Sequence, residues 1–262
     1  MHSRPTALPR PSVLRALPAM MLREMATTYG RSPGGYLWAV VEPVAAIALL
    51  SFVFSMAFDA PSLGNSFALF YATGYLPFML FHDTTNKIGA ALRFSRPLLA
   101  YPAVSMVDAV LARWLLNTAT HVIVGLIVFA GIEAVIDTSA LYRPGPILAA
   151  YAMAAALALG VGTLNCWLFM RFPVWERIWQ IATRPLFIVS GIFFLFEDLP
   201  ADLRDIAWFN PLLHITSDMR RGVFASYDAA FVSEGFVYGT ALVCFVTGLG
   251  LLRLAGKDLV YG

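Results

Sequence analysis

The sequence has few charged residues. They make up 13% of its 262 residues, whereas 59% are hydrophobic. An ordinary globular domain has about 25% charged and about 45–50% apolar residues. A soluble protein of this composition would lack the polar side chains needed to cover its surface. In a lipid bilayer the surface need not be polar, although every backbone N–H and C=O group must then form a hydrogen bond within the protein. The composition therefore indicates an integral membrane protein.

Lysine is scarce as well, because Lys87 and Lys257 are the only two in the chain. A P-loop needs a glycine-rich loop followed by Lys and then Ser or Thr, since its backbone cradles phosphates and its lysine reaches them. Neither lysine has that context. We therefore expect no nucleotide site of this type in the chain. If the protein is driven by ATP, its ATPase must be another polypeptide.

The residues that build metal and catalytic sites are also few and scattered. Cys166 and Cys244 lie inside apolar runs, and there is no CxxC pair, HExxH or GxSxG. The four histidines are far apart in sequence. His121 follows Asn117 by one helical turn, which favours hydrogen bonding between helices over metal ligation. We predict no enzyme activity, no metal and no cofactor bound by this chain.

Six apolar stretches are long enough to cross a bilayer, which takes about 20 residues. They cover approximately residues 36–58, 66–92, 108–132, 146–170, 178–196 and 233–254, and the second and fifth are the least apolar. The sequence thus predicts an all-α integral membrane protein, with residues 1–35 as a cytoplasmic N-terminus and 36–262 as a domain of six transmembrane helices. Most Lys and Arg then fall on the inner side, which places both termini in the cytoplasm.

Three other segments are distinctive. Prolines make residues 1–18 a poor helix, but the run from Ala19 to Arg31 is amphipathic and predicts an interfacial helix on the membrane surface. Residues 93–107 form a cytoplasmic loop with two prolines. Residues 197–230 lie outside, are rich in apolar side chains and break at Asn210-Pro211, which predicts two short half-helices that dip back toward the membrane.

Several side chains within the spans leave alternatives open. Asp83 and Lys87 are spaced to form an i,i+4 salt bridge. Small residues recur along the fourth span, and Gly235 and Gly239 form a GxxxG in the sixth. Small stripes let helix backbones approach closely, and this approach serves either packing within one subunit or an interface between subunits.

Three blocks of sequence resemble one family. The segment Leu22–Pro43, LREMATTYGRSPGGYLWAVVEP, resembles the opening of the membrane subunits of ABC exporters for capsular polysaccharide and O-antigen, in the ABC-2 class. The matching positions are Arg23, Glu24, Tyr29, Gly30, Gly35, Tyr36, Leu37, Trp38, Ala39, Glu42 and Pro43. Leu98–Arg113 is similar to the family's cytoplasmic coupling segment, and Trp208–Phe224 to its periplasmic N-P-L-x-H block.

The resemblance implies a permease in the inner membrane of a Gram-negative bacterium. It implies a homodimer with two copies of a cytoplasmic ATPase, which would bind ATP and Mg, and with periplasmic and outer-membrane export proteins. The substrate would be a polysaccharide, lipid-linked and capsular, and no nucleic acid is implied. An O-antigen exporter and an ABC-2 permease for a small drug or lipid remain the alternatives. A secondary transporter would show inverted repeats, which the sequence lacks.

The resemblance also implies roles for particular residues. The residues expected to couple to the ATPase are Arg23, Glu24, Arg93, Arg96, Leu98, Leu99 and Tyr101. Those expected in a periplasmic gate are Trp208, Asn210, Pro211, His214, Asp218 and Arg220. The family often has an acid where Ser217 stands, so the pairing of the next residue, Asp218, with Arg220 or Arg221 is open.

Aromatic residues are candidates for the substrate path. A sugar ring packs its C–H face on an aromatic face and leaves its hydroxyls free. Tyr36, Trp38, Tyr71 and Tyr75 are the substrate-binding candidates, and interfacial aromatic belts are the alternative explanation for them.

Overall fold

The part of the chain that the computed structural model describes is entirely helical. It covers residues 13–28, 34–99, 105–138 and 140–261, and contains ten α-helices and one short 3-10 helix. The prediction of an all-α protein is confirmed.

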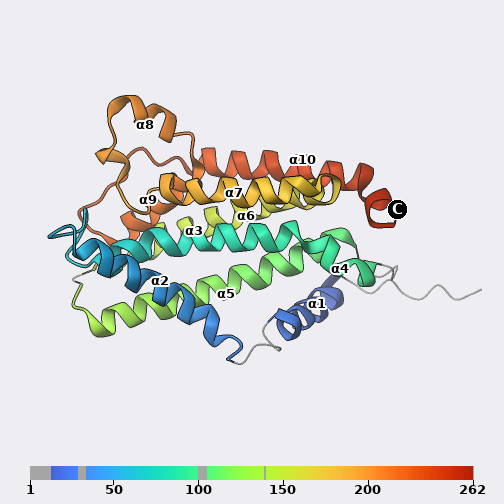
Figure 1. Cartoon of the computed structure of the whole chain (residues 1–262), viewed down its shortest axis with the longest axis horizontal. Helices are drawn as coiled ribbons and strands as arrows, with labels where there is room; N and C mark the ends of the chain where they lie inside the picture. Colours follow the sequence, from blue (N-terminus) through green and yellow to red (C-terminus); the bar gives the residue numbers. More distant parts are fainter. Residues whose placement is uncertain (1–12, 29–33, 100–104, 139, 262) are drawn as a thin grey trace, which may run out of the picture.

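The long helices lie where the apolar stretches are. The elements are α1 (Val13–Thr28), α2 (Leu37–Ser55), α3 (Phe67–Gly89), α4 (Ala91–Leu99), α5 (Met106–Val135), α6 (Pro144–Arg171), α7 (Pro173–Val189), η1 (Phe196–Asp198), α8 (Ala201–Ala207), α9 (Pro211–Val223) and α10 (Glu234–Tyr261). The helices α2, α3, α5, α6, α7 and α10 correspond to the six stretches in order. They run along the long axis of the molecule, with α8 and α9 toward one end and α1 and α4 toward the other (Figure 1).

Helix α3 is the centre of the bundle. Most of its 23 residues are buried, and it packs against α2, α5, α6 and α9. By contrast, α2 has a single buried residue, Ile47. The core therefore surrounds α3, whereas most of the surface of α2 is available to lipid or to another subunit.

The small residues of α6 serve packing within the subunit. Ala154 and Ala158 are fully buried. A Cβ on Gly160 would lie 2.2 Å from the carbonyl oxygen of Ala241 in α10, so the two backbones nearly touch there. Gly239 of the GxxxG in α10 has open space around its missing side chain instead.

Four of the described helices are long and apolar enough to cross a membrane, namely α2, α5, α6 and α10. Helix α3 falls short because polar residues fill its last third, from His82 to Lys87. Helix α7 has only 17 residues and includes Arg177 and Arg184. These are the two helices whose stretches are the least apolar in the sequence.

Two expectations about the cytoplasmic side are wrong. Helix α1 begins at Val13 rather than Ala19 and contains Pro18, so the prolines do not delay it as expected. The segment predicted as a loop from residue 93 is helical up to Leu99, because Ala91, Leu92 and Ser95 form a buried side for α4. Residues 100–104, including Tyr101, lie outside the described part of the chain.

Residues 197–230 contain the two short α-helices α8 and α9, and the chain breaks between them at Asn210-Pro211. The Asn210 side-chain oxygen accepts a hydrogen bond from the Leu212 amide at 3.1 Å, and Pro211 occupies the first helical position. Asn is a preferred N-cap, and Pro at N1 has no amide hydrogen to leave unpaired. This sequence therefore starts α9 at a defined residue.

Candidate functional site

A polar cavity lies between α2, α3 and α5. Its volume is about 140 Å³. Its lining residues are Trp38, Ala39, Glu42, Pro43, Tyr75, Leu76, Met79, Asp83, Lys87, Asn117, Thr120, His121 and Val124. Ionisable residues inside a membrane domain are costly, so they mark functional positions by default.

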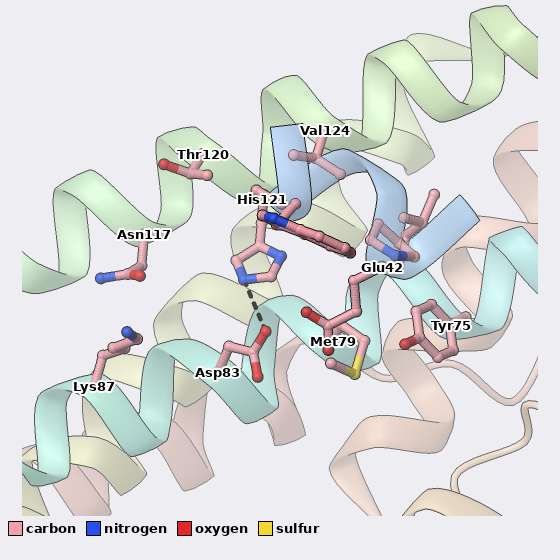
Figure 2. Close-up of a pocket in the computed structure, with 13 residues that line it drawn as sticks. Glu42, Tyr75, Met79, Asp83, Lys87, Asn117, Thr120, His121 and Val124 are labelled. Atoms are coloured by element: carbon pink, nitrogen blue, oxygen red, sulfur yellow. Dashed lines mark ion pairs between the residues drawn. The ribbon is translucent and has the colours of Figure 1, made fainter. Parts of the chain in front are cut away.

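Asp83 and His121 face each other across this cavity (Figure 2). His121 Nε2 lies 3.3 Å from Asp83 Oδ2, which is an ionic contact when the imidazole is protonated. The i,i+4 spacing predicted Lys87 as the partner of Asp83, but the carboxylate turns instead to the neighbouring helix. The expected contact of His121 with another helix is confirmed.

Two of the four aromatic candidates line the cavity, namely Trp38 and Tyr75. Trp38 is 57% exposed, so its indole is accessible at the surface of the subunit. Tyr71 is 2% exposed and packs on Phe54, with ring centroids 5.2 Å apart. Tyr36 precedes α2 and is not among the lining residues. The structure thus brings Trp38 and Tyr75 to one site and leaves Tyr71 in the core of the subunit.

A second cavity lies next to the first, between α3 and α7, and Met79 lines both. Its volume is about 470 Å³. It is lined by Phe78, Met79, His82, Asn86, Gln180, Thr183, Arg184 and Phe187. We call it the α3/α7 groove. The sequence reasoning missed it, since the only signal in α7 is a set of polar residues at helical spacing within an otherwise apolar stretch.

Hydrogen bonds fix one wall of this groove. Trp179 Nε1 donates to Asn86 Oδ1 at 3.0 Å, which ties α7 to α3. The Asn86 amide in turn lies 3.2 Å from His82 Nε2. Since that amide nitrogen can only donate, His82 accepts at Nε2 and carries its proton on Nδ1. The chain of three side chains holds Asn86 at a set position in the groove.

Comparison with known proteins identifies the family. The family described as ABC-2 type transporter matches residues 15–224 of the chain. This chain belongs to the ABC-2 type transporter family. The match covers most of α1 and all of α2 to α9, and hence both cavities.

Its relatives in the ABC-2 family match over nearly their whole length. The capsule polysaccharide export inner-membrane protein BexB of Haemophilus influenzae is 30% identical, over 94% of this chain and 92% of its own. The polysialic acid transport protein KpsM of Escherichia coli is 28% identical, over 90% and 91%. The capsule polysaccharide export inner-membrane protein CtrC of Neisseria meningitidis serogroup B is 28% identical, over 94% and 92%.

Two of the residues that the ABC-2 resemblance associates with an ATPase, Arg23 and Glu24, belong to a cluster around Phe94 of α4 and Arg113 of α5. Arg113 of α5 forms an ion pair with Glu24 of α1 at 3.1 Å, and both side chains are buried. The Arg113 guanidinium also lies 4.4 Å from the centre of the Phe94 ring and donates to the carbonyl of Lys87 at 2.7 Å. Arg23 lies over the same ring at 5.8 Å. Four helices are therefore joined at one guanidinium, and the sequence reasoning missed Arg113.

A second link joins α4 to α7 in this ABC-2 chain. Arg93 Nη2 donates to both carboxylate oxygens of Glu176 at 2.9 Å. Arg96 lies on the same exposed side of α4, and Leu98 and Leu99 are its last two residues. Helix α4 thus has a side toward the bundle and a side open to a partner.

The expected gate residues lie at the opposite end of this ABC-2 domain, around α9. His214 is buried, with Nε2 at 2.7 Å from the Trp208 carbonyl and Nδ1 accepting from the Ser233 amide at 3.1 Å. Burial lowers the pKa of His214, in keeping with a neutral ring that donates at Nε2. His214 therefore ties the start of α9 to both the end of α8 and the start of α10.

Arg220 holds α9 to the turn that follows α7. It is fully buried and donates to the carbonyls of Phe194 at 2.9 Å and Ile192 at 3.0 Å, with its guanidinium 4.2 Å from the Phe70 ring. Asp218, also buried, pairs with Arg221 at 2.5 Å. The open question of the partner of Asp218 is thereby answered in favour of Arg221. Arg220 interacts with backbone carbonyls and an aromatic ring.

Proposed function

We propose that this chain is the membrane-spanning subunit of an ATP-driven exporter that moves capsular polysaccharide across the inner membrane. One observation carries the proposal: the sequence matches inner-membrane capsule export proteins over 94% of this chain and 92% of theirs. Similarity that runs end to end, rather than over one motif, supports a shared activity. The same relatives favour capsule over O-antigen or a small-molecule substrate.

Six helices cross the membrane in this proposal. Four meet the requirement alone, and α3 joins them because most of its residues are buried and its charged and polar side chains line the two cavities. Helix α7 joins them because its polar side faces the α3/α7 groove rather than lipid. Both termini are then cytoplasmic, with α1 as the interfacial helix, while α8 and α9 form the gate helices on the periplasmic side.

The functional unit is a homodimer with two ATPase subunits, which bind ATP and Mg. Helix α2 supports the dimer, since its large apolar residues, among them Leu49 (63%) and Phe52 (64%), are exposed on a single subunit. A second copy would cover part of this surface. The exposed side of α4 would contact the ATPase, as the resemblance implies for Arg93 and Arg96.

Motion of α4 has two routes to the rest of the subunit. Phe94 and Arg113 connect it to α1, α5 and the end of α3. Arg93 and Glu176 connect it to α7. Both routes end at helices that border the cavities, so nucleotide-driven movement of α4 would change the shape of both.

The substrate path runs along α3 in this proposal. Trp38 and Tyr75 provide aromatic surfaces for sugar rings, and the polar groups of the first cavity provide hydrogen-bond partners for hydroxyls. The polymer, carried on a lipid anchor, would leave past α8 and α9 toward periplasmic and outer-membrane export proteins.

A deletion strain tests the proposed function. Surface glycan and intracellular glycan are extracted separately from cells lacking the chain, and from the same cells carrying the wild-type chain or Arg96→Glu. The deletion strain, and the same strain carrying Arg96→Glu, should lose surface capsule and accumulate polymer inside the cell. The wild-type chain should restore surface capsule. Normal surface capsule in the deletion strain would refute capsule export, and loss of O-antigen instead would identify the alternative polysaccharide.

A further inference from the structure

A hollow without polar side chains lies between α2 and α5. We call it the α2/α5 groove, and its volume is about 340 Å³. Ile47 and Val128 are buried and form its floor, whereas Val44 and Val135 form an exposed rim. All ten lining residues are Ala, Gly, Val or Ile, so no side chain there can form a hydrogen bond. A sugar in the groove would lose the hydrogen bonds of its hydroxyl groups to water without replacing them, so the groove fits an apolar ligand.

Small residues on both helices leave this space open. A Cβ on Gly131 of α5 would meet nothing within 4 Å, and Ala48 of α2 also lines the groove. Both helices are long and apolar enough to cross a membrane, so the groove opens toward lipid tails. Walls that face an empty hollow lose dispersion contacts, and an acyl chain from the bilayer would restore them.

The side of α2 proposed for a second copy points away from the groove. At 3.6 residues per turn, Leu49 and Phe52 lie about 200° and about 140° around α2 from Ile47. Both are exposed, whereas Ile47 is buried in the floor of the groove. A dimer formed through Leu49 and Phe52 would therefore leave the groove open to lipid.

The groove ends at a polar link between α3 and α5. Ile136, the last residue of its lining, follows α5 at the end of the bundle opposite α4 (Figure 1). The next residue, Asp137, accepts a hydrogen bond at its backbone carbonyl from Asn65 Nδ2 at 3.3 Å. Asn65 stands just before α3, whose first turn contributes Ala68 to the groove. The exposed Asp137 thus stands at the end of the hollow and just past a membrane-spanning helix, where lipid headgroups begin.

This end of the groove is negatively charged. Glu133, in the last turn of α5, accepts a hydrogen bond at 2.9 Å from the hydroxyl of Tyr142, a donor without charge. Among the residues that the structure describes, no Lys or Arg forms an ion pair with Glu133 or Asp137. Arg143, the only basic residue between α5 and α6, donates instead to the carbonyl of Ala225 at 3.4 Å. A cationic group would complement the two carboxylates, and an anionic group would be repelled.

We propose that the α2/α5 groove binds one acyl chain of phosphatidylethanolamine, whose ammonium group pairs with the carboxylate of Asp137. An ammonium group has both a positive charge and N–H donors, whereas the choline group of phosphatidylcholine has no N–H. Phosphatidylglycerol has no cationic group, and Asp137 and Glu133 would repel its phosphate. The site goes beyond the proposed function, because the groove would hold this lipid whatever the substrate is. The bound chain would join α2, which has a single buried residue, to the rest of the bundle.

Photoreactive lipids test this proposal. The transporter, complete with its ATPase, is reconstituted in phosphatidylcholine nanodiscs that contain a small fraction of one probe. The probes are phosphatidylethanolamine, phosphatidylcholine and phosphatidylglycerol, each with a diazirine on one acyl chain. After illumination, mass spectrometry quantifies the labelling of peptides from α2 and α5. Labelling requires no transport, so its outcome is independent of whether the chain exports capsule.

Two sets of variants separate the acyl chain from the headgroup. Gly131→Leu and Ala48→Leu fill the groove, and Gly235→Leu is their matched control, since its side chain also meets open space but lies on α10. Asp137→Asn removes the carboxylate and keeps the backbone carbonyl that Asn65 binds. Its control is Asp228→Asn, an exposed acid in the segment after α9.

In the wild type, the phosphatidylethanolamine probe should label the lining segments about two- to fivefold more than the phosphatidylcholine probe, as one exposed ion pair implies. The phosphatidylglycerol probe should label them least. Gly131→Leu and Ala48→Leu should lose most of this labelling, and Asp137→Asn should lose the preference for phosphatidylethanolamine. Both control variants should behave as the wild type.

Four results would overturn the proposal. Labelling unchanged in both groove-filling variants would show that no acyl chain enters the groove. Equal labelling by the three probes, or a preference for phosphatidylglycerol, would show that the carboxylates do not select the headgroup. A preference unchanged in Asp137→Asn would assign the ammonium to another residue. A disulfide between two copies of Val135→Cys, absent from the wild type with its own Cys166 and Cys244, would place a second subunit over the groove.

Discussion

Arg113 of α5 and Glu24 of α1 form an ion pair at 3.1 Å, with only 6% and 9% of their side chains exposed. They are 89 residues apart in sequence. The pair therefore fixes a surface helix to a core helix of the domain, and it does so at the ring of Phe94, on the helix proposed to contact the ATPase.

Glu24→Gln should destabilise the protein strongly. It leaves the Arg113 charge buried without its carboxylate, which costs about 3–5 kcal/mol when one member of a buried pair is removed. The measurement is the thermal unfolding midpoint in detergent. The matched control is Glu176→Gln, whose partner Arg93 is 55% exposed, so that its loss should cost at most about 1 kcal/mol. Equal shifts for the two variants would contradict this prediction.

Charge exchange between Arg93 and Glu176 tests the link from α4 to α7. Glu176→Arg alone should leave the ATPase active but reduce ATP-dependent glycan uptake several-fold, because movement of α4 no longer reaches α7. The double variant Arg93→Glu, Glu176→Arg should recover most of the uptake, since this exposed pair tolerates exchange. Failure of the double variant to recover, with normal folding and ATPase binding, would show that the link does not transmit movement.

Gly160 and Gly239 form a matched pair for helix packing. Gly160→Ala would place a methyl group 2.2 Å from the Ala241 carbonyl oxygen and force α6 and α10 apart, at a cost of about 1–3 kcal/mol. Gly239→Ala meets nothing within 4 Å and should stabilise its helix by up to about 1 kcal/mol. Unfolding midpoints and the oligomeric state are measured for both. A dimer lost in Gly239→Ala would assign the GxxxG to a subunit interface.

The end of the bundle that holds His214 should lose stability between about pH 7 and pH 5.5. Burial lowers the pKa of His214 in the native state. As pH falls through about 6.5, the unfolded chain binds a proton that the native state does not, so the native state loses up to about 1.4 kcal/mol per pH unit. Burial raises the pKa of Asp218, whose contribution has the opposite sign.

The contribution of His214 is isolated by comparing the wild type with His214→Gln. The variant is less stable at neutral pH, since it loses the ring that joins Trp208 and Ser233. Its unfolding midpoint should nevertheless fall less than that of the wild type between pH 7 and pH 5.5. An equal fall in both proteins would show that other groups determine the pH dependence.

Much of the fold follows from local chemistry that the sequence displays directly. Apolar length predicts where the long helices lie, and the pair Asn210-Pro211 predicts the start of α9 because a cap and an N1 proline act within one turn. The same local reasoning shows that neither lysine belongs to a P-loop, in keeping with a family of transport subunits.

The partners of the polar side chains were harder to predict. Glu24 lies in the amphipathic run from Ala19 to Arg31, and its buried partner Arg113 follows 89 residues later in α5. Asp83 had a local partner in Lys87 but contacts His121 of α5. Each outcome depends on which helices become neighbours, and helix periodicity carries no information about that.

The position of α3 has a consequence for biogenesis. Helix α3 is synthesised before α5 and α6, yet these later helices cover much of its surface. In the proposed six-span arrangement, α3 would present Asp83 and Lys87 to lipid on leaving the ribosome, before the later helices are there to shield them. Stable integration of α3 therefore depends on the arrival of segments translated after it, and a chain truncated after α4 should be degraded rather than accumulate in the membrane.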